Sequence, residues 1–458
     1  MPRFTDSFLW RSRYWLTAIG VIASLQFVDG PHRLPRSVGC LNTSAVGGVR
    51  IGASGAIERL APDTLKRLGE QRRRAIADAS SDMRKPSELR KVSLRALESA
   101  IAESLEKARP VPEEIQLLAG LQSIEYVFVY PERRDIVLAG FGEGWKTNER
   151  GDIVGVTSEK PVLMLDDLLV ALRHAEQAAT DGISCSIDPT PAGLERLRSH
   201  VAGLKTIGNP QQTGKSIEQA LGPQTVTITG LPPTTHFAHV MVAADYRMKR
   251  LGMNLDASPV PGLTSYVQLL GGGGRGLSAI APRWWLVPDY EPVVVDDEGL
   301  AYQVRSNGVK CLTEDTVFAA DGTSRQAGQS SPAAQRWADM MTSKYGQLAA
   351  KEPVFAELRN LMDLAVVAAL IYQERLSDKA GYSLPLLLNS AELPYERFEA
   401  VKQTDTVAGL MKKGNNWVIS ASGGVQIRPS EVVRQKTIDA QLAESRRPTA
   451  EPKSWWWD

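Results

Sequence analysis

Cysteine and histidine are scarce in this 458-residue sequence, which has only three of the first and five of the second. The cysteines are Cys40, Cys185 and Cys311, so at most one disulfide can form within the chain. No Cys-x-x-Cys pair and no Cys/His cluster has the spacing of a zinc site. We therefore expect neither a metal nor a cofactor.

A strong excess of charge of either sign is also lacking. Lys and Arg number 53 against 52 Asp and Glu, a formal net charge of +1, so no overall field would attract nucleic acid. Basic residues are enriched only in residues 1–110, which could contact anionic lipid or an acidic polymer. The favoured interpretation is that the cluster from Lys66 to Arg74 is the solvated face of an amphipathic helix.

No apolar run reaches the roughly 20 residues that span a bilayer comfortably. The longest near the N-terminus, Tyr14 to Val28, follows Arg3, Arg11 and Arg13, which is the layout of a secretory signal peptide. No small-x-small cleavage site follows it, so residues 1–30 are either a signal peptide or an uncleaved anchor. Lipidation of Cys40 is the weaker alternative, because Arg33, Pro35 and Arg36 separate it from the apolar core. Export is the expectation in each case.

Past this leader, the pattern predicts an α+β protein with one main boundary. Residues 31–325 form a mixed domain of β-hairpins, a meander and helices. The Gly/Ser/Gln-rich segment Asp321–Pro332 then links it to a mostly helical unit, 333–445, that includes a terminal hairpin, and residues 446–458 are a flexible tail.

Several elements follow from periodicity and turn residues. Hairpins are predicted for 49–52 with 56–60, for 124–130 with 136–139, and for 417–420 with 425–428; a meander is predicted for 293–295, 300–305 and 309–312. Helices are predicted for 62–79, 86–109, 163–179, 333–350 and 353–376, with a further helix that ends near Gly252.

One string imitates a phosphate-binding loop but fails on spacing. Gly208 to Ser216 ends in Gly-Lys-Ser, yet five residues separate its glycines where that loop needs four, and no apolar strand precedes it. Nucleotide hydrolysis is therefore rejected.

Four residues are candidates for chemistry. His236 and His239 lie three residues apart at the start of a helix, but no third metal ligand accompanies them, so capping or packing roles are favoured. Cys185 and Asp188 lie at a strand end before a helix, where nucleophiles of α/β enzymes occur, although a buried cysteine on a strand is commoner. The sequence leaves open whether the four converge.

The last residues include Trp455, Trp456 and Trp457, which are costly to expose. They either dock on the body of the protein or anchor it to a partner or a membrane interface.

Several blocks together resemble an exported, planctomycete-type bacterial family that is described only as a domain of unknown function. The blocks are YVFVYPE (126–132), DIVLAG (135–140), GEGW (142–145), PVLMLDDLLVALR (161–173), ISCSIDPTPAGL (183–194), VMVAADYRMKRL (240–251), PRWWLVPDY (282–290) and FAELRNLMDLAVVAALI (355–371). The resemblance covers about residues 49–376. It implies export and brings no activity, cofactor or catalytic residue with it.

The leading expectation is therefore a non-catalytic interaction protein of the envelope or periplasm, whose partner is an unknown envelope protein or polymer. Membrane contact would be made through the N-terminal apolar segment and the Trp455–Trp457 tail. The alternative is an exported hydrolase-like enzyme that uses Cys185 or Asp188 with His236 or His239. Which of the two applies depends on whether these side chains converge in a pocket.

Overall fold

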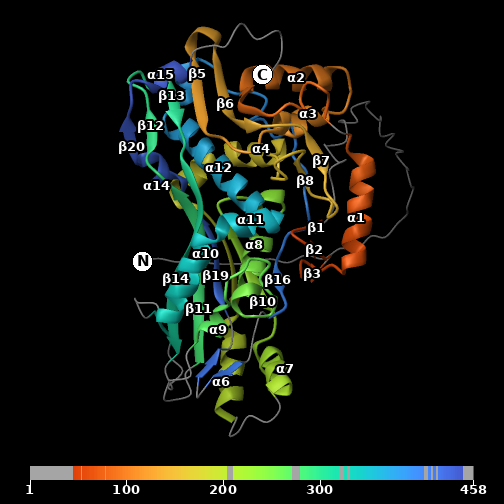
Figure 1. The fold of residues 1–458 in the computed structure, drawn as a ribbon, viewed down its shortest axis with the longest axis vertical. Helices are drawn as coiled ribbons and strands as arrows, with labels where there is room; N and C mark the ends of the chain where they lie inside the picture. The colour runs from red at the N-terminus through yellow and green to blue at the C-terminus, as the bar shows by residue number, and fades with distance from the viewer. Residues whose placement is uncertain are drawn as a thin grey trace, which may run out of the picture. The chain divides into compact units, whose positions relative to one another are not determined.

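A computed structural model (Figure 1) describes residues 45–52, 54–77, 79–203, 210–270, 279–318, 324–326, 331–406, 411–413, 416–418, 421–446 and 457. These residues all belong to one compact unit, Pro35–Asp458. The predicted leader, Cys40, much of the segment 321–332, Trp455 and Trp456 lie outside the described residues.

The larger sheet has nine strands in the order β15-β14-β11-β19-β9-β10-β16, with β18 also paired to β11 and β17 paired to β18. Most neighbours are antiparallel, whereas β19 and β18 run parallel to β11. The strands are β9 (Ile183–Pro189), β10 (Gln224–Thr229), β11 (Ala279–Tyr290), β14 (Ser306–Phe318), β15 (Ser324–Gln326), β16 (Gln403–Thr404), β17 (Met411–Lys413), β18 (Asn416–Val418) and β19 (Ser422–Ile427).

The second sheet has six strands in the order β20-β12-β13-β5-β6-β4. They are β4 (Ser87–Ser93), β5 (Tyr126–Tyr130), β6 (Asp135–Gly142), β12 (Val293–Val295), β13 (Ala301–Gln303) and β20 (Lys436–Ile438). Two small sheets are formed by β1 (Ala45–Val46), β2 (Val49–Ile51) and β3 (Ile57–Arg59), and by β7 (Trp145–Thr147) with β8 (Ile153–Gly155). The combination of mixed sheets and helices confirms the predicted α+β class.

The helices of the first half are α1 (Pro62–Ala75), α2 (Leu94–Glu106), α3 (Glu113–Gln116), α4 (Leu165–Arg173), α5 (Ala175–Asp181), α6 (Pro191–Gly203), α7 (Pro210–Leu221) and α8 (His236–Gly252). Those of the second half are α9 (Tyr266–Leu269), α10 (Pro332–Ser343), α11 (Tyr345–Lys351), α12 (Pro353–Gln373), α13 (Leu376–Ala380), α14 (Pro429–Arg434) and α15 (Leu442–Ser445).

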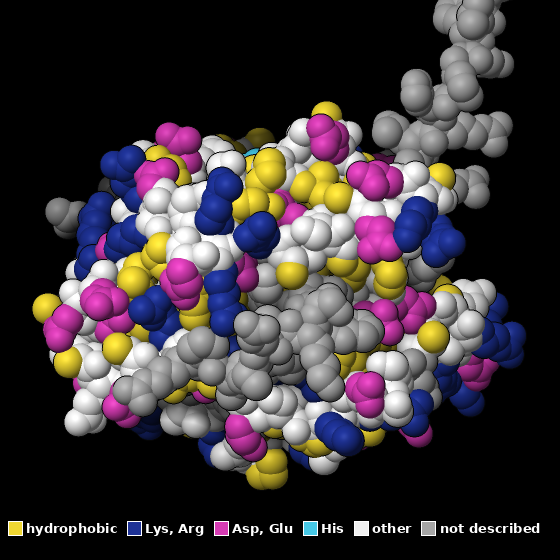
Figure 2. Space-filling view, turned by 90° about the horizontal axis from the view of Figure 1, so that it is seen from above, with side chains coloured by type: hydrophobic (Ala, Val, Ile, Leu, Met, Phe, Trp, Pro, Cys, Tyr) yellow, Lys and Arg dark blue, Asp and Glu magenta, His cyan; other side chains and the backbone are white. Residues whose placement is uncertain are grey.

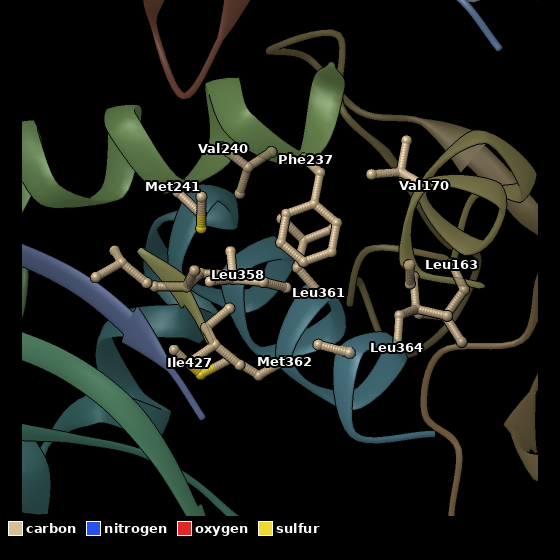
Figure 3. Close-up of a cluster of buried hydrophobic side chains, with 14 of the residues drawn as sticks. Leu163, Val170, Phe237, Val240, Met241, Leu358, Leu361, Met362, Leu364 and Ile427 are labelled. Carbon is tan, nitrogen blue, oxygen red and sulfur yellow. The ribbon is translucent and has the colours of Figure 1, made fainter. Parts of the chain in front are cut away.

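Helix α12 is the centre of the helical packing. Of its 21 residues, 16 are buried, which its nearly uniform apolar sequence requires, because every face of the helix must find a partner. Its partners include α4, α5, α8, α11 and α14. Figure 3 shows the apolar contact with α8, where Phe237, Val240 and Met241 point toward Leu358, Leu361 and Met362.

The two parts that the sequence separates at 321–332 share this core. Residues before the segment, such as Val240 and Trp284, and residues after it, such as Trp337 and Leu361, belong to the same buried cluster. The small polar residues of this segment predict that proteases cut the chain there first. Among the described residues, none of the helices has the length and apolar character needed to cross a bilayer.

Local hairpins agree with the sequence pattern, and pairings over longer distances do not. The hairpins β2–β3 and β5–β6 form as predicted. The meander, however, ends after β12 and β13, because β14 leaves to pair with β11 in the other sheet. In the same way, β18 and β19 pair with β11 and not with each other.

The C-terminal tail docks in part on the protein itself. Trp457 forms an antiparallel bridge with Val92 of the edge strand β4, and the guanidinium of Arg90 lies 5.2 Å from the centre of its ring. The guanidinium and the indole make a cation–π contact. Intramolecular docking is therefore what the structure shows for Trp457.

Candidate functional site

The candidate site lies at the N-terminal end of α8. Thr235 caps this helix, since its side-chain oxygen accepts a hydrogen bond from the amide of Ala238. The cap places His236 and His239 in the first turn. The side chains of the two histidines contact different residues.

His236 forms a dyad with Asp167 of α4. Its Nδ1 atom lies 2.9 Å from Oδ2 and 3.2 Å from Oδ1 of the carboxylate, and both side chains are largely buried, with 13% and 5% of their surface exposed. A carboxylate on Nδ1 fixes the orientation of the ring and leaves Nε2 for another contact. Because 69 residues separate His236 and Asp167 in the chain, the sequence alone did not indicate that they form a pair.

The dyad borders a small cavity of about 30 Å³, which has room for one or two water molecules. Four helices contribute to its wall: α1, α4, α8 and α12. The lining residues are Arg72, Ile153, Pro161, Val162, Leu163, Met164, Asp167, His236, Glu357, Asn360, Leu361 and Leu364.

Glu357 and Asn360 bring polar groups to this wall from one face of α12. Asn360 donates from Nδ2 to the carbonyl of Pro161 at 3.0 Å, while its buried Oδ1 accepts no hydrogen bond from the described residues. Glu357 adds a carboxyl group to the same wall. On the opposite side, Arg72 of α1 donates to the carbonyl of Gly151 at 2.9 Å.

The charges of the cavity perturb one another. Burial works against the charged form of His236, but the nearby Asp167 carboxylate outweighs it and raises the pKa of the imidazole to about 9. Burial raises the pKa of Glu357 to about 7, and the positive charges of His236 and Arg72 only partly oppose this rise. The cavity therefore holds an imidazolium near neutral pH and a carboxyl group that titrates there.

His239 has a separate, structural environment. Its Nε2 lies 2.7 Å from the carbonyl oxygen of Glu399, and its ring packs against Phe398. Burial lowers the pKa of His239 to about 4, so the ring is neutral and donates to the carbonyl. His236 and His239 therefore hold different partners. Groups of three or more Cys, His, Asp or Glu residues able to hold a metal are absent from the described part of the chain.

Cys185 and Asp188 do not join the cavity. Cys185 lies on β9 between β10 and β19 and is fully buried. Burial, together with the neighbouring Asp245 carboxylate, raises the pKa of its thiol well above the usual range. Neither Cys185 nor Asp188 is among the lining residues.

Cys185 instead neighbours a buried ion pair that the sequence analysis missed. Lys249 and Asp245 of α8 have no exposed surface and are joined at 2.9 Å. The ammonium also donates to the carbonyls of Ile187 and Gly423, so its three protons hold α8 to β9 and β19. A sequence signal existed, since Asp and Lys at i, i+4 interrupt an otherwise apolar helix.

The part of the phosphate-loop-like string that the structure describes, residues 210–216, is helical, and Gly208 and Asn209 lie outside the described residues. Gly214, Lys215 and Ser216 lie inside α7, and Ser216 Oγ bonds His200 of α6 at 2.9 Å. An amide cradle for phosphate requires a loop that precedes a helix.

A comparison with models of protein families gives a match at residues 185–266. No curated protein and no solved structure matches this chain. The match covers β9 from Cys185 onward, α8 and the buried Asp245–Lys249 pair, but of the dyad it includes His236 and not Asp167. A DUF1598 domain, described as a protein of unknown function, is found at residues 185–266.

Proposed function

We propose that this chain is an exported, non-catalytic interaction protein of the cell envelope. The observation that carries the proposal is the size and content of the cavity at His236. About 30 Å³ accommodates water but no organic substrate, whereas ligand pockets usually measure hundreds of cubic ångströms.

Two of the other candidate groups, Cys185 and His239, support the same proposal, because each is enclosed by or bonded to the fold itself. The thiol of Cys185 is buried and held in its protonated form, and His239 is bonded to a backbone carbonyl. A nucleophile needs an accessible, activated atom and a base within reach.

Export is supported by the sequence of the leader and by the resemblance to an exported planctomycete-type family. The distribution of charge on the surface supports the kind of partner that we propose. On the face seen in Figure 2, basic and acidic side chains are interspersed, with hydrophobic side chains between them. Such a mixed surface fits an envelope protein or polymer better than nucleic acid.

The first experiment tests export. Residues 1–45 are fused to a reporter that is active only outside the cytoplasm, and activity is expected. Ile19→Asp with Ile22→Asp should abolish it, because each charge costs about 3 kcal/mol in an apolar segment. The matched control, Asn42→Asp with Thr43→Asp, adds the same charges after the apolar run and should retain most of the activity. A reporter confined to the cytoplasm in the unmodified fusion would refute export.

A second experiment tests the absence of catalysis against the hydrolase alternative. The purified protein is assayed with chromogenic esters, phosphates and glycosides beside His236→Gln, Glu357→Gln and Cys185→Ser, with His200→Gln as a control away from the cavity. We expect no turnover above background. Turnover that disappears in Glu357→Gln or Cys185→Ser, and persists in His200→Gln, would establish an enzyme in place of an interaction protein.

A further inference from the structure

We propose that the outer edge of β4 is a docking site for an extended peptide segment of an envelope protein, and that the segment carries an aromatic residue. The chain's own Trp457 occupies this site when no such segment is bound. The proposal rests on the proposed function, because it names the kind of partner that the interaction protein takes.

Trp457 sits where a further strand of the sheet would lie. Strand β4 is the last strand on one side of the six-stranded sheet, and Trp457 pairs with it in antiparallel register, opposite Val92. Val92 lies opposite Leu138 of β6, which lies opposite Val127 of β5. These three side chains belong to the main buried cluster, and the indole packs against that cluster. An extended segment on this edge would therefore continue both the sheet and its apolar face.

Arg90 gives the edge a preference for aromatic rings. It is buried on β4, and its guanidinium donates to the carbonyls of Met83, Lys85 and Ala119 at 3.2, 2.8 and 2.6 Å. These bonds fix the guanidinium, which lies 5.2 Å from the centre of the Trp457 ring. A fixed cation at this distance favours a π system over an aliphatic side chain.

The indole of Trp457 satisfies the site incompletely. Its ring nitrogen is buried and has no hydrogen-bond partner among the described residues. A buried donor without an acceptor costs about 1–3 kcal/mol. A phenylalanine ring offers a π face without that donor, so a partner segment that carries phenylalanine can compete with the chain's own residue.

The length of chain that leads to Trp457 makes the contact exchangeable. Arg446 is held at the end of β5, because its guanidinium donates to the carbonyl of Val129 at 3.0 Å and its carbonyl accepts from the hydroxyl of Tyr130 at 2.7 Å. Trp457 lies three strand spacings from β5, about 15 Å. The 11 residues from Arg446 to Trp457 can reach about 36 Å, so the chain does not force the contact. A link of this length gives an effective concentration of about 1 mM, which a segment of higher affinity can overcome.

Binding of a synthetic peptide to the full-length protein tests the site. The probe is a fluorescein-labelled peptide with the sequence of residues 452–458, Pro-Lys-Ser-Trp-Trp-Trp-Asp, followed by fluorescence polarisation. The double variant Trp455→Ala with Trp457→Ala should bind it at least about tenfold more tightly than wild type, because its own tail no longer competes. Trp455 is included because a shift by two residues would present it on the same face. Tyr372→Ala, which removes an exposed aromatic side chain of α12, is the control and should bind like wild type.

Altered peptides separate strand pairing from apolar adsorption. Two peptides carry N-methyl groups on alternate residues, one peptide for each alternating set. In an added strand only one of these sets bonds to β4, so one peptide should bind at least about tenfold more weakly and the other nearly as well as the probe. A peptide with phenylalanine in place of its last tryptophan should bind at least as tightly as the probe. Equal weakening by the two methylated sets would contradict strand addition.

Hydrogen–deuterium exchange of the double variant, with and without the probe, locates the site. Protection should increase in β4 and not in β20, the opposite edge of the same sheet. Equal affinity of wild type and the double variant, binding to neither up to 1 mM probe, or protection away from β4 would overturn the proposal. A wild-type dimer that dissociates in the double variant would also overturn it, because the occupant would then be a second copy of the chain.

Circular dichroism checks that the double variant is folded. If it is not, the methylated peptides are compared on the wild-type protein at tenfold higher concentration, where failure to discriminate between them overturns the proposal. Export and catalysis are measured separately, so a β4 edge that binds no peptide leaves the interaction role to another surface.

Discussion

Glu143 is fully buried and Glu357 is half-buried, and the carboxylate of Glu143 is surrounded by hydrogen-bond donors. Its carboxylate accepts bonds from the amides of Thr157 and Ser158 and from Gln122 Nε2. Burial alone would raise the pKa of Glu143, but these bonds outweigh it and lower the pKa to about 2. Burial is not outweighed at Glu357, whose pKa rises to about 7. Hydrogen bonding thus decides the charge state of each carboxyl group.

This contrast predicts that replacing glutamate by glutamine has opposite effects on the free energy of unfolding at the two positions. Glu143→Gln should lower the free energy of unfolding at pH 7 by about 2–3 kcal/mol, because ionised Glu143 stabilises the fold above its unfolded pKa. The loss should shrink as pH falls toward 2. Glu357→Gln at pH 8 should be within about 1 kcal/mol of wild type or more stable, because it removes a carboxylate that is costly to ionise.

Urea denaturation at pH 3.5, 6 and 8 measures both effects. The two variants serve as controls for each other, since each replaces a glutamate by its neutral isostere. Equal destabilisation of the two at pH 8 would contradict the assignment of their charge states.

The sequence predicted helices and strands correctly where a local pattern of residues determines them. The hairpin β5–β6 has alternating strands around a short turn, and α12 is apolar throughout, so both were identified. Strand β4 was mistaken for the start of a helix. Its buried positions are Arg90 and Val92, and the charged residue hides the alternation that marks a strand. Ser93 then caps the real helix, α2.

The candidate site shows the same limit in space. His236 was recognised as a candidate and Asp167 only as part of the predicted helix 163–179, because no local pattern indicates that the two helices are in contact. Arg72, Glu357 and Asn360 come from further segments, and α1 and α12 are almost 300 residues apart. Only tertiary packing brings them to one cavity.

At the same scale, the central position of β19 makes a specific glycine indispensable. Strand β19 lies between β11 and β9, and a Cβ atom on Gly424 would lie 1.8 Å from the carbonyl oxygen of Cys185. Gly424→Ala should therefore lower the free energy of unfolding by more than about 3 kcal/mol, since a backbone atom must move. Gly346→Ala in α11 is the matched control, because its Cβ meets open space.

The control should be neutral or stabilising by up to about 1 kcal/mol, the difference in helix propensity between the two residues. Thermal unfolding followed by circular dichroism compares the variants. Similar stabilities of Gly424→Ala and wild type would show that β19 does not occupy its central position.

For the whole molecule, the continuous core determines what a cut in the chain can do. Trp284 on β11 and Trp337 on α10 pack with ring centres 5.5 Å apart, and α10 also lies along β14. The Gly/Ser/Gln-rich segment 321–332 joins these elements and includes strand β15. The small polar residues that follow β15 in the sequence favour proteolysis there. The packing predicts, however, that cleavage would not release two independent domains.

Limited proteolysis should therefore cut first within 321–332 and leave two fragments that elute together as one folded particle. They should separate only in denaturant, where a single cooperative transition is expected, because neither fragment can bury its half of the shared core alone. Size-exclusion chromatography before and after the addition of urea measures this. Two fragments that elute separately in buffer, each with a melting transition of its own, would mean that residues on the two sides of the segment build independent cores.

Trp337→Ala should weaken the association of the cut fragments, since it removes a ring that lies on the second fragment and packs against the first. Tyr372→Ala, which removes an aromatic side chain with 45% of its surface exposed, should leave the association intact.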